Sequence, residues 1–135
     1  MEKSDFPPAS LGESLGIEAV ADSGEGGKAV LHCRATMAMC HSGGIVQGGF
    51  VTGWIDAAMA HVVIAQTKHE LRPLSLEIKI SFLKAASPGL LVAEAWVEKL
   101  GRTTAFLEGR LLDEKGEVLA KGTSTAKLVP IKPRG

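Results

Sequence analysis

Apolar and polar residues alternate strictly over one part of the chain, from Leu74 to Phe82. Every second residue is leucine, isoleucine or phenylalanine, and serine, glutamate or lysine lies between them. A period of two is typical of a half-buried antiparallel strand. Three further runs with strand character follow at 91–100, 103–112 and 118–129, separated by turn residues. We therefore predict four consecutive strands linked by hairpins.

Two shorter alternating runs, 17–22 and 28–36, precede this region. The segment between them, 23–27, reads Ser-Gly-Glu-Gly-Gly, which is typical of a hairpin turn. The residues before them, 1–16, are predicted to form an N-terminal arm or short helix, and 130–135 a C-terminal tail. One domain, 17–129, lies between these ends.

A long apolar segment, 48–67, separates the two groups of strands. It contains no proline, and its length favours a helix over a strand. Because its apolar residues point in nearly all directions, the helix should be buried. An antiparallel sheet can hide such a helix by curling around it. The pattern predicts an α+β fold, with an antiparallel sheet wrapped around one long central helix. Long sheet edges favour pairing, so we expect a homodimer or a dimer of dimers with a continuous sheet.

Composition narrows the possible partners. The 135 residues are 45% hydrophobic and 22% charged, which suits one globular domain, and fifteen basic residues balance fifteen acidic ones. No basic face therefore indicates nucleic acid or an anionic membrane. The longest uncharged run, 35–55, contains five glycines, a histidine and a glutamine and makes a poor membrane span.

The two cysteines, Cys33 and Cys40, lie in no metal-binding or redox spacing, and no signal peptide precedes them. We expect reduced thiols, a cytoplasmic location, and no metal or other cofactor.

Candidate chemistry is concentrated around the start of the predicted helix. Glycine destabilises a helix interior by about 1 kcal/mol relative to alanine, and an unpaired buried carboxylate costs far more, yet glycines and Asp56 occur together here. The amides of Gly48 and Gly49 have no intrahelical acceptor and lie at the positive end of the helix dipole. A carboxylate in an apolar wall near amides that polarise a carbonyl is the arrangement that acyl transfer to water requires.

Each feature also has a purely structural explanation. Gly49, Gly53 and Ala57 recur at every fourth position and could be a packing stripe, as loop glycines are commonly turns. Asp56 could be a core aspartate bonded to backbone, and His41 a surface histidine. Only the combination favours a catalytic site.

That combination resembles a known family. Gln47-Gly48-Gly49, followed seven residues after the second glycine by Asp56, is similar to the His-Gly-Gly and acidic-residue signature of the hotdog-fold acyl-CoA thioesterases of the phenylacetate-degradation and 4-hydroxybenzoyl-CoA type. The strand segment LSLEIKISFLKAASPG and the closing segment VEKLGRTTAFLEGRLLDEKGEVLAKGTST resemble the same family, so the likeness spans about 17–129.

The resemblance implies a role for several residues. Asp56 would be nucleophile or general base on a thioester, and the Gly48 amide would polarise its carbonyl, with the two coming from different subunits of a dimer. Ser75, on the following strand, would help place the water. Gln47 stands where the family usually has histidine; it can hydrogen-bond the thioester but cannot act as an acid. His41 stands where asparagine or glutamine is common, and it could position water or ligand.

The resemblance also implies an acyl-CoA substrate, although the chain has no phosphate-binding loop. Lys99 and Arg102 flank a turn glycine in the closing hairpins and are candidates for contacts with the CoA phosphates, while a solvated hairpin tip explains them equally well.

Two other functions stay open. A hotdog dehydratase acting on a 3-hydroxyacyl thioester would pair a loop histidine with a helix carboxylate, and His41 precedes Asp56 at a suitable separation. The loop reads HSGGIVQGG, however, and lacks the proline-rich context of those enzymes, and no hydratase-type segment is present. A non-catalytic acyl-CoA binder is the third possibility.

Overall fold

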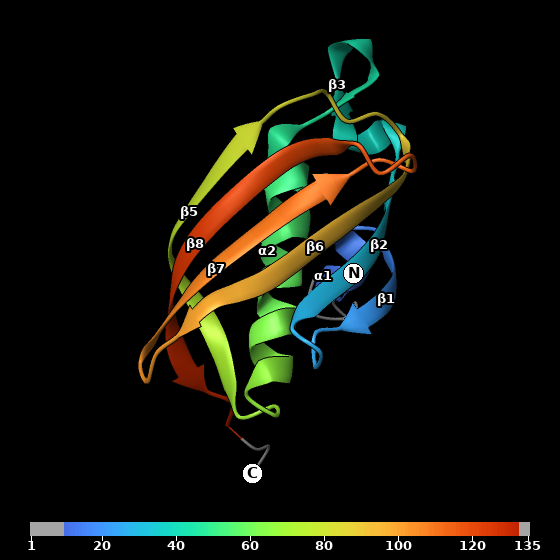
Figure 1. Cartoon of the computed structure of the whole chain (residues 1–135). Helices are drawn as coiled ribbons and strands as arrows, with labels where there is room; N and C mark the ends of the chain where they lie inside the picture. The colour runs from blue at the N-terminus through green and yellow to red at the C-terminus, as the bar shows by residue number, and fades with distance from the viewer. Residues whose placement is uncertain (1–9, 133–135) are drawn as a thin grey trace, which may run out of the picture.

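The computed structural model describes residues 10–132, so the first nine residues of the predicted arm and the last three of the predicted tail lie outside it. Two helices, eight strands and two single-turn 3₁₀ segments follow one another in the described part of the chain (Figure 1). Their bounds are α1 Leu11–Ser14, β1 Ile17–Ser23, β2 Lys28–Ala35, η2 Met37–Met39, β3 Cys40–His41, η3 Ser42–Gly44, β4 Ile45–Val46, α2 Gly48–Gln66, β5 Leu71–Phe82, β6 Gly89–Leu100, β7 Thr104–Leu112 and β8 Val118–Pro130.

One antiparallel sheet forms the body of the protein and curves around α2 (Figure 1). Its strand order is β1-β2-β6-β7-β8-β5. The core lies between the concave face and the helix, where Trp54, Ile55 and Met59 meet buried residues of the sheet such as Leu31 and Leu111. The predicted fold class, a sheet wrapped around one long helix, is confirmed.

The predicted order of strands is wrong at one link. We expected β5 to form a hairpin with β6, but β5 pairs with β8 along its whole length, from Leu71↔Pro130 to Phe82↔Ala120. Residues 83–88 instead lead from the sheet edge to β6, which pairs with β2 and β7. The alternation of apolar and polar residues shows which side chains of a strand face the core. It does not show which other strand is the hydrogen-bonded neighbour, and this explains the error.

The predicted burial of α2 is confirmed for the side that forms the core but not for its whole circumference. The sheet covers one side of it, and Leu15 packs against Gly53 on another, where a β-carbon would lie 3.2 Å from the leucine side chain. Gly49 and Asp56 are exposed. By length and composition alone α2 could cross a membrane, but it is the core helix here. The exposed residues Gly49 and Asp56 therefore form an open strip of α2, which lies between Leu15 and β5.

A β-bulge interrupts β5 between Ser75 and Glu77. Beyond it Ile78 and Ile80 pack against the core, whereas Leu74 and Leu76 before and at the bulge are 57% and 62% exposed. The strand is also the last in the sheet, so among the described residues its outer edge has no neighbour. β5 therefore presents both unpaired backbone groups and apolar side chains to solvent.

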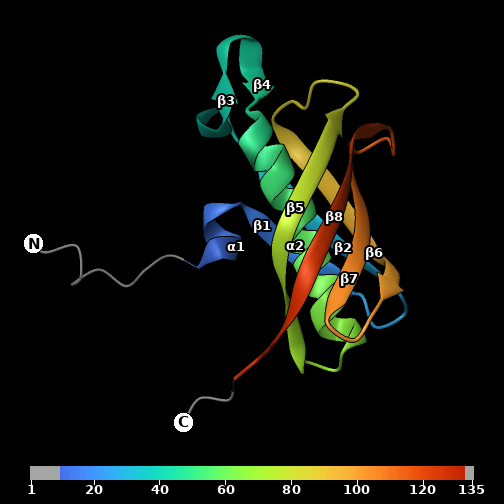
Figure 2. The same ribbon diagram turned by 90° about the vertical axis from the view of Figure 1, so that its left-hand side faces the viewer.

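A small hairpin, β3–β4, stands beyond the N-terminal end of α2 (Figure 2). Gly43 and Gly44 form its tip at φ of 81° and 71°, where glycine is favoured. Its stem is tied to the body, because the Val46 N–H donates to the Ala86 carbonyl at 2.9 Å. The Gln47 N–H donates to the Met39 carbonyl at 2.9 Å and closes the base of the hairpin. Sequence patterning did not reveal this hairpin, whose strands are only two residues long.

Candidate active site

The helix begins with a capped turn. Gln47 is the N-cap residue, and its side-chain Oε1 accepts a hydrogen bond from the Gly49 N–H at 2.8 Å, while its carbonyl accepts from the Phe50 N–H at 3.0 Å. The Gly48 N–H donates to no group among residues 10–132. One of the two amides expected to be free is therefore already satisfied. The Gly48 amide remains, at the positive end of the helix dipole.

A hollow of about 410 Å³ opens beside Gly48. It lies between the β3–β4 hairpin, the first turns of α2, residues 82–86 and residues 119–120, and we call it the helix-end hollow. His41 and Gly48 both line it, so the structure brings these two predicted site residues together. The Phe82 ring stands against Gly48, because a β-carbon there would lie 3.1 Å from the ring.

A second group of predicted residues meets on the open strip of α2. The Ser75 hydroxyl donates to the Asp56 carboxylate at 3.3 Å, and both residues are exposed. Thr52, one turn before Asp56, donates instead to the Gly48 carbonyl at 2.9 Å. Asp56 is thus a solvent-facing carboxylate with one side-chain donor, and its expected burial in an apolar wall is incorrect for the single chain.

The two groups are far apart within one chain. Gly48 and Asp56 are eight residues apart on α2, which corresponds to a rise of about 12 Å. A carbonyl that accepts a hydrogen bond from Gly48 lies within about 3 Å of it, beyond the reach of Asp56 in the same chain. The structure therefore places the predicted site residues in two separate groups, Gly48 with His41 and Asp56 with Ser75, which we call half-sites.

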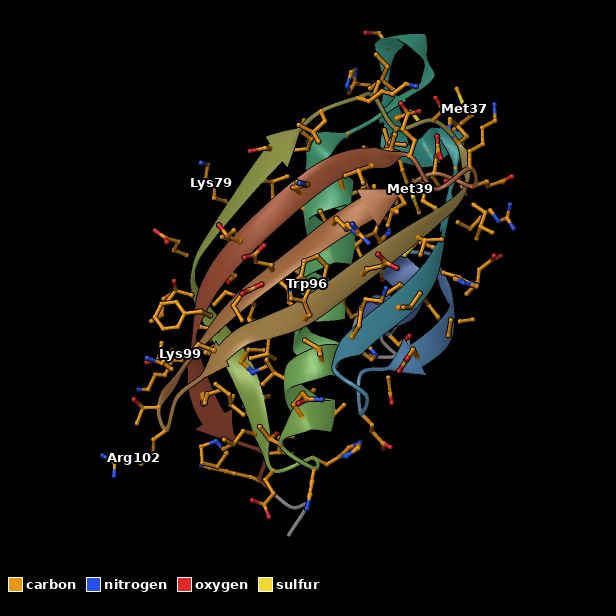
Figure 3. The ribbon with its side chains drawn as sticks, viewed as in Figure 1. Met37, Met39, Lys79, Trp96, Lys99 and Arg102 are labelled. Carbon is orange, nitrogen blue, oxygen red and sulfur yellow. The ribbon has the colours of Figure 1, made fainter. Side chains whose placement is uncertain are left out.

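Lys99 and Arg102 lie elsewhere. Figure 3 shows Lys99 near the end of β6 and Arg102 in the β6–β7 turn, at the end of the sheet remote from the β3–β4 hairpin. Both are exposed, and neither takes part in an ion pair among the described residues. They do not join either half-site in the single chain.

A further hollow, about 230 Å³, lies on the outer face of the sheet near Trp96 and Lys79 (Figure 3). The Arg110 guanidinium stacks over the Trp96 ring at 5.6 Å and donates to Glu94 at 2.8 Å. None of the predicted site residues lines this hollow, and the full thickness of the sheet separates it from α2.

The cysteines fit the expected reduced state. Cys33 is fully buried in the core, and burial raises the pKa of its thiol from 9.0 to about 12. The Cys40 thiol donates to the Thr36 carbonyl at 3.4 Å, and both cysteines are free. Among residues 10–132, no group of three or more His, Cys, Asp or Glu side chains is placed to hold a metal ion.

Sequence reasoning assigned no role in binding to Phe82, which it treated as the final apolar position of a strand. Its side chain is 56% exposed, and the neighbouring Leu83 is 59% exposed. One sequence feature could have indicated a binding role: two large apolar residues follow one another at the end of a strand, immediately before a lysine and two alanines.

Comparisons with known proteins agree with this architecture. The model of the family described as "Thioesterase superfamily" matches residues 43–120. The structure of the Escherichia coli PaaI protein from the phenylacetic acid degradation operon is similar with a TM-score of 0.78 and 22% identity, covering 87% of this chain and 86% of that one. A putative thioesterase from Ralstonia eutropha JMP134, described as phenylacetic acid degradation-related, gives 0.76 and 28%, covering 93% and 94%.

A hypothetical thioesterase from Streptococcus pneumoniae TIGR4, solved with coenzyme A, is similar with a TM-score of 0.73 and 23% identity, covering 87% of each chain. No curated protein sequence matches this chain. The hotdog fold expected from the sequence is confirmed by the sheet and by these structures.

Proposed function

This chain belongs to the thioesterase superfamily, and from that premise we propose that it hydrolyses acyl-CoA thioesters to the free acid and coenzyme A. The observation that carries the proposal is the pair of half-sites on α2, a free amide at Gly48 and the carboxylate of Asp56 held by Ser75. The first suits a carbonyl oxygen and the second suits a water molecule.

In the proposed reaction the thioester oxygen accepts a hydrogen bond from the Gly48 N–H, which stabilises the negative charge that develops during attack. Asp56 acts as general base, taking a proton from water as the water oxygen bonds to the carbonyl carbon, or attacks that carbon itself as nucleophile. The carbon–sulfur bond then breaks, and the sulfur leaves with the bonding electrons and takes a proton, from protonated Asp56 in the general-base route and from water in the nucleophilic route. In the nucleophilic route a water molecule then hydrolyses the mixed anhydride on Asp56, which releases the free acid and restores the carboxylate. Ser75 orients the carboxylate, and Gln47 orients the thioester through the amide group that its cap leaves free.

The distance within one chain supports a site shared between two copies. Because about 12 Å of helix separates Gly48 from Asp56, the carboxylate that serves one chain's amide belongs to a second chain. The unpaired edge of β5, with Leu74 and Leu76 exposed, offers the surface for such pairing. We therefore propose a homodimer, or a dimer of two such dimers, with a continuous sheet.

Coenzyme A as the carrier is supported by two similar proteins. The Streptococcus pneumoniae structure contains coenzyme A, and a similar Streptococcus mutans structure contains acetyl-CoA. In this chain we propose that Lys99 and Arg102 contact the phosphates, since both are exposed and unpaired among the described residues. The reaction uses no metal or other cofactor in this proposal, and a cytoplasmic location stays a prediction.

The test is a screen of the purified protein against short, long and aryl acyl-CoA substrates, with thiol release as the readout and 3-hydroxyacyl-CoA as a parallel substrate. We expect thiol release that an Asp56→Asn variant abolishes. Enoyl formation without thiol release, lost in His41→Ala, would instead establish the dehydratase. Tight acyl-CoA binding without either reaction would establish the non-catalytic binder.

A further inference from the structure

The helix-end hollow has an apolar lining that the fold itself does not use. Ile45, Phe82 and Leu83 are large apolar side chains on its walls, and they are 38%, 56% and 59% exposed. Large apolar side chains gathered around a concavity mark a surface that becomes buried when a ligand binds. Val51 and Leu119, which are buried, complete the apolar walls.

Polar groups in the hollow are few, and its charge is already paired. The lining includes one lysine, Lys84, and its ammonium group donates to the Glu117 carboxylate at 2.7 Å. His41 lies on the β3–β4 hairpin, at the same end as the Gly48 amide. A ligand group with its own charge or several amides would exchange hydrogen bonds to water for few protein partners here, which is unfavourable.

We propose that the helix-end hollow receives the acyl group of the substrate and selects acyl groups that are apolar and uncharged. The inference rests on the proposed function, because it takes the Gly48 amide as the point where the thioester carbonyl is held. From that point an acyl group and the pantetheine arm must leave in different directions. Pantetheine carries two amides and a hydroxyl, for which this mostly apolar lining offers few partners, whereas an aliphatic or aryl group needs only apolar contact.

Phe82 is the specificity-determining residue in this proposal. Its ring stands against Gly48 and borders the hollow, so it contacts the first carbons of the acyl group next to the carbonyl. The pairing of β5 with β8, at Phe82↔Ala120, fixes the backbone position from which the ring extends. It therefore limits branching and bulk near the carbonyl, while the rest of the hollow takes the more distant carbons.

Three variants test the assignment. Ala85→Phe places a ring in the hollow from an exposed loop position, where the risk to folding is small, and Phe82→Ala enlarges the hollow next to Gly48. Phe106→Ala is the matched control, since Phe106 is 44% exposed but lies on β7 outside the hollow. None of these residues belongs to the proposed catalytic groups.

The first measurement is kcat/KM for a series of straight-chain acyl-CoA substrates, with phenylacetyl-CoA and the charged succinyl-CoA alongside. We expect wild type to gain roughly fourfold per methylene until the hollow is full, as burial of methylene groups predicts. Ala85→Phe should flatten this slope, Phe82→Ala should favour substrates that are bulky next to the carbonyl, and Phe106→Ala should match wild type. Succinyl-CoA should be among the poorest substrates.

The second measurement does not depend on turnover. Calorimetry compares the affinity of a non-hydrolysable hexyl-CoA thioether with that of free CoA. We expect Ala85→Phe to weaken thioether binding about tenfold or more and to leave CoA binding unchanged. If both affinities fall equally, the hollow holds pantetheine, and if neither changes, it holds no part of the substrate; either result overturns the inference. Chain-length-dependent binding without thiol release from any substrate would overturn the proposed function and leave the acyl assignment intact.

Discussion

The Ser75 hydroxyl donates to the Asp56 carboxylate at 3.3 Å, joining the edge strand to the open strip of the central helix. A β-bulge makes this contact possible. Ser75 and Ile78 are an odd number of residues apart and would face opposite sides of a regular strand. The irregularity between Ser75 and Glu77 restores them to one face, so that the serine reaches the helix while Ile78 still packs in the core.

This contact leads to the first prediction, which concerns Asp56. Asp56→Asn keeps the size of the side chain but removes the base or nucleophile, and general-base catalysis alone contributes about 10²–10⁴-fold. We expect nearly complete loss of thiol release with an unchanged melting temperature, because Asp56 is exposed. Ser75→Ala should lose less, since the carboxylate remains. Half of the wild-type rate in Asp56→Asn would contradict the mechanism.

The Gly48 amide can be removed without losing the helix. Gly48→Pro deletes the N–H at the first helical position, where proline is favoured, and the preceding Gln47 already has φ −65° and ψ 137°, a conformation that suits a residue before proline. We expect kcat to fall about 10²–10³-fold, the usual effect of losing one oxyanion donor.

Gly48→Ala is the control for this change. It adds a β-carbon against the Phe82 ring, as proline does, but keeps the N–H. Circular dichroism should find both variants folded. Equal activity in the alanine and proline variants would remove the amide from the mechanism.

Gln47 has two roles that mutation can separate. Gln47→Ala removes the cap on Gly49, which should lower the free energy of unfolding by about 1 kcal/mol, and it also removes the amide beside the thioester. Gln47→Ser restores a capping oxygen but not that amide. We expect both variants to lose about a hundredfold in turnover if the amide donates to the oxyanion, with stability recovered only in the serine variant.

His41→Ala should be milder than either Gln47 variant in a thioesterase. Thiol release and chemical denaturation of all three proteins decide the ranking. The reverse order, with His41→Ala the most damaged, would favour the dehydratase, whose histidine is the base.

Assembly should follow from the edge of β5. We expect wild type to sediment as a dimer or tetramer, and Leu76→Lys to shift it toward monomer and reduce activity, because a charge at the edge opposes pairing. Leu100→Lys, also at an exposed leucine but at the end of β6, is the control. A monomeric wild type with full activity would rule out the shared site.

Hybrid dimers test the shared site more directly. Mixing Asp56→Asn chains with Gly48→Pro chains and allowing exchange gives hybrids in which one of the two sites has both groups intact. We expect recovery of up to about a quarter of wild-type activity, since half the dimers are hybrid and each carries one intact site. If the two inactive variants stay inactive together, Gly48 and Asp56 act within one chain.

Cys33 should make stability depend on alkaline pH. Burial raises its pKa from 9.0 to about 12, so between these values the folded protein keeps a proton that the unfolded chain releases. The unfolding free energy should therefore fall as pH rises through this window. Urea unfolding at neutral pH and above pH 9 measures the change, and Cys33→Ala should reduce it. An identical pH dependence in wild type and variant would contradict the prediction.

Some features of this protein follow from the order of its residues alone. The length of the apolar segment 48–67 predicted a helix, and the alternation in 74–82 predicted a strand. Because only one long helix accompanies several strands, the sequence also predicted that the sheet encloses it. Gly48 and Asp56 could be named because glycine and an unpaired carboxylate are costly in an ordinary helix, whereas His41 and Ser75 were named only from the family resemblance. These properties are local, so a sequence pattern can express them.

Tertiary structure decided how those residues meet. The pairing of β5 with β8, the bulge that turns Ser75 toward Asp56, and the position of Phe82 over Gly48 all depend on which segments become neighbours in space. Alternation is compatible with several strand partners, and a bulge shifts every later side chain to the other face. The separation of Gly48 from Asp56 along one rigid helix is the consequence that bears most on function, because a fixed rise per residue keeps the two groups apart in every chain.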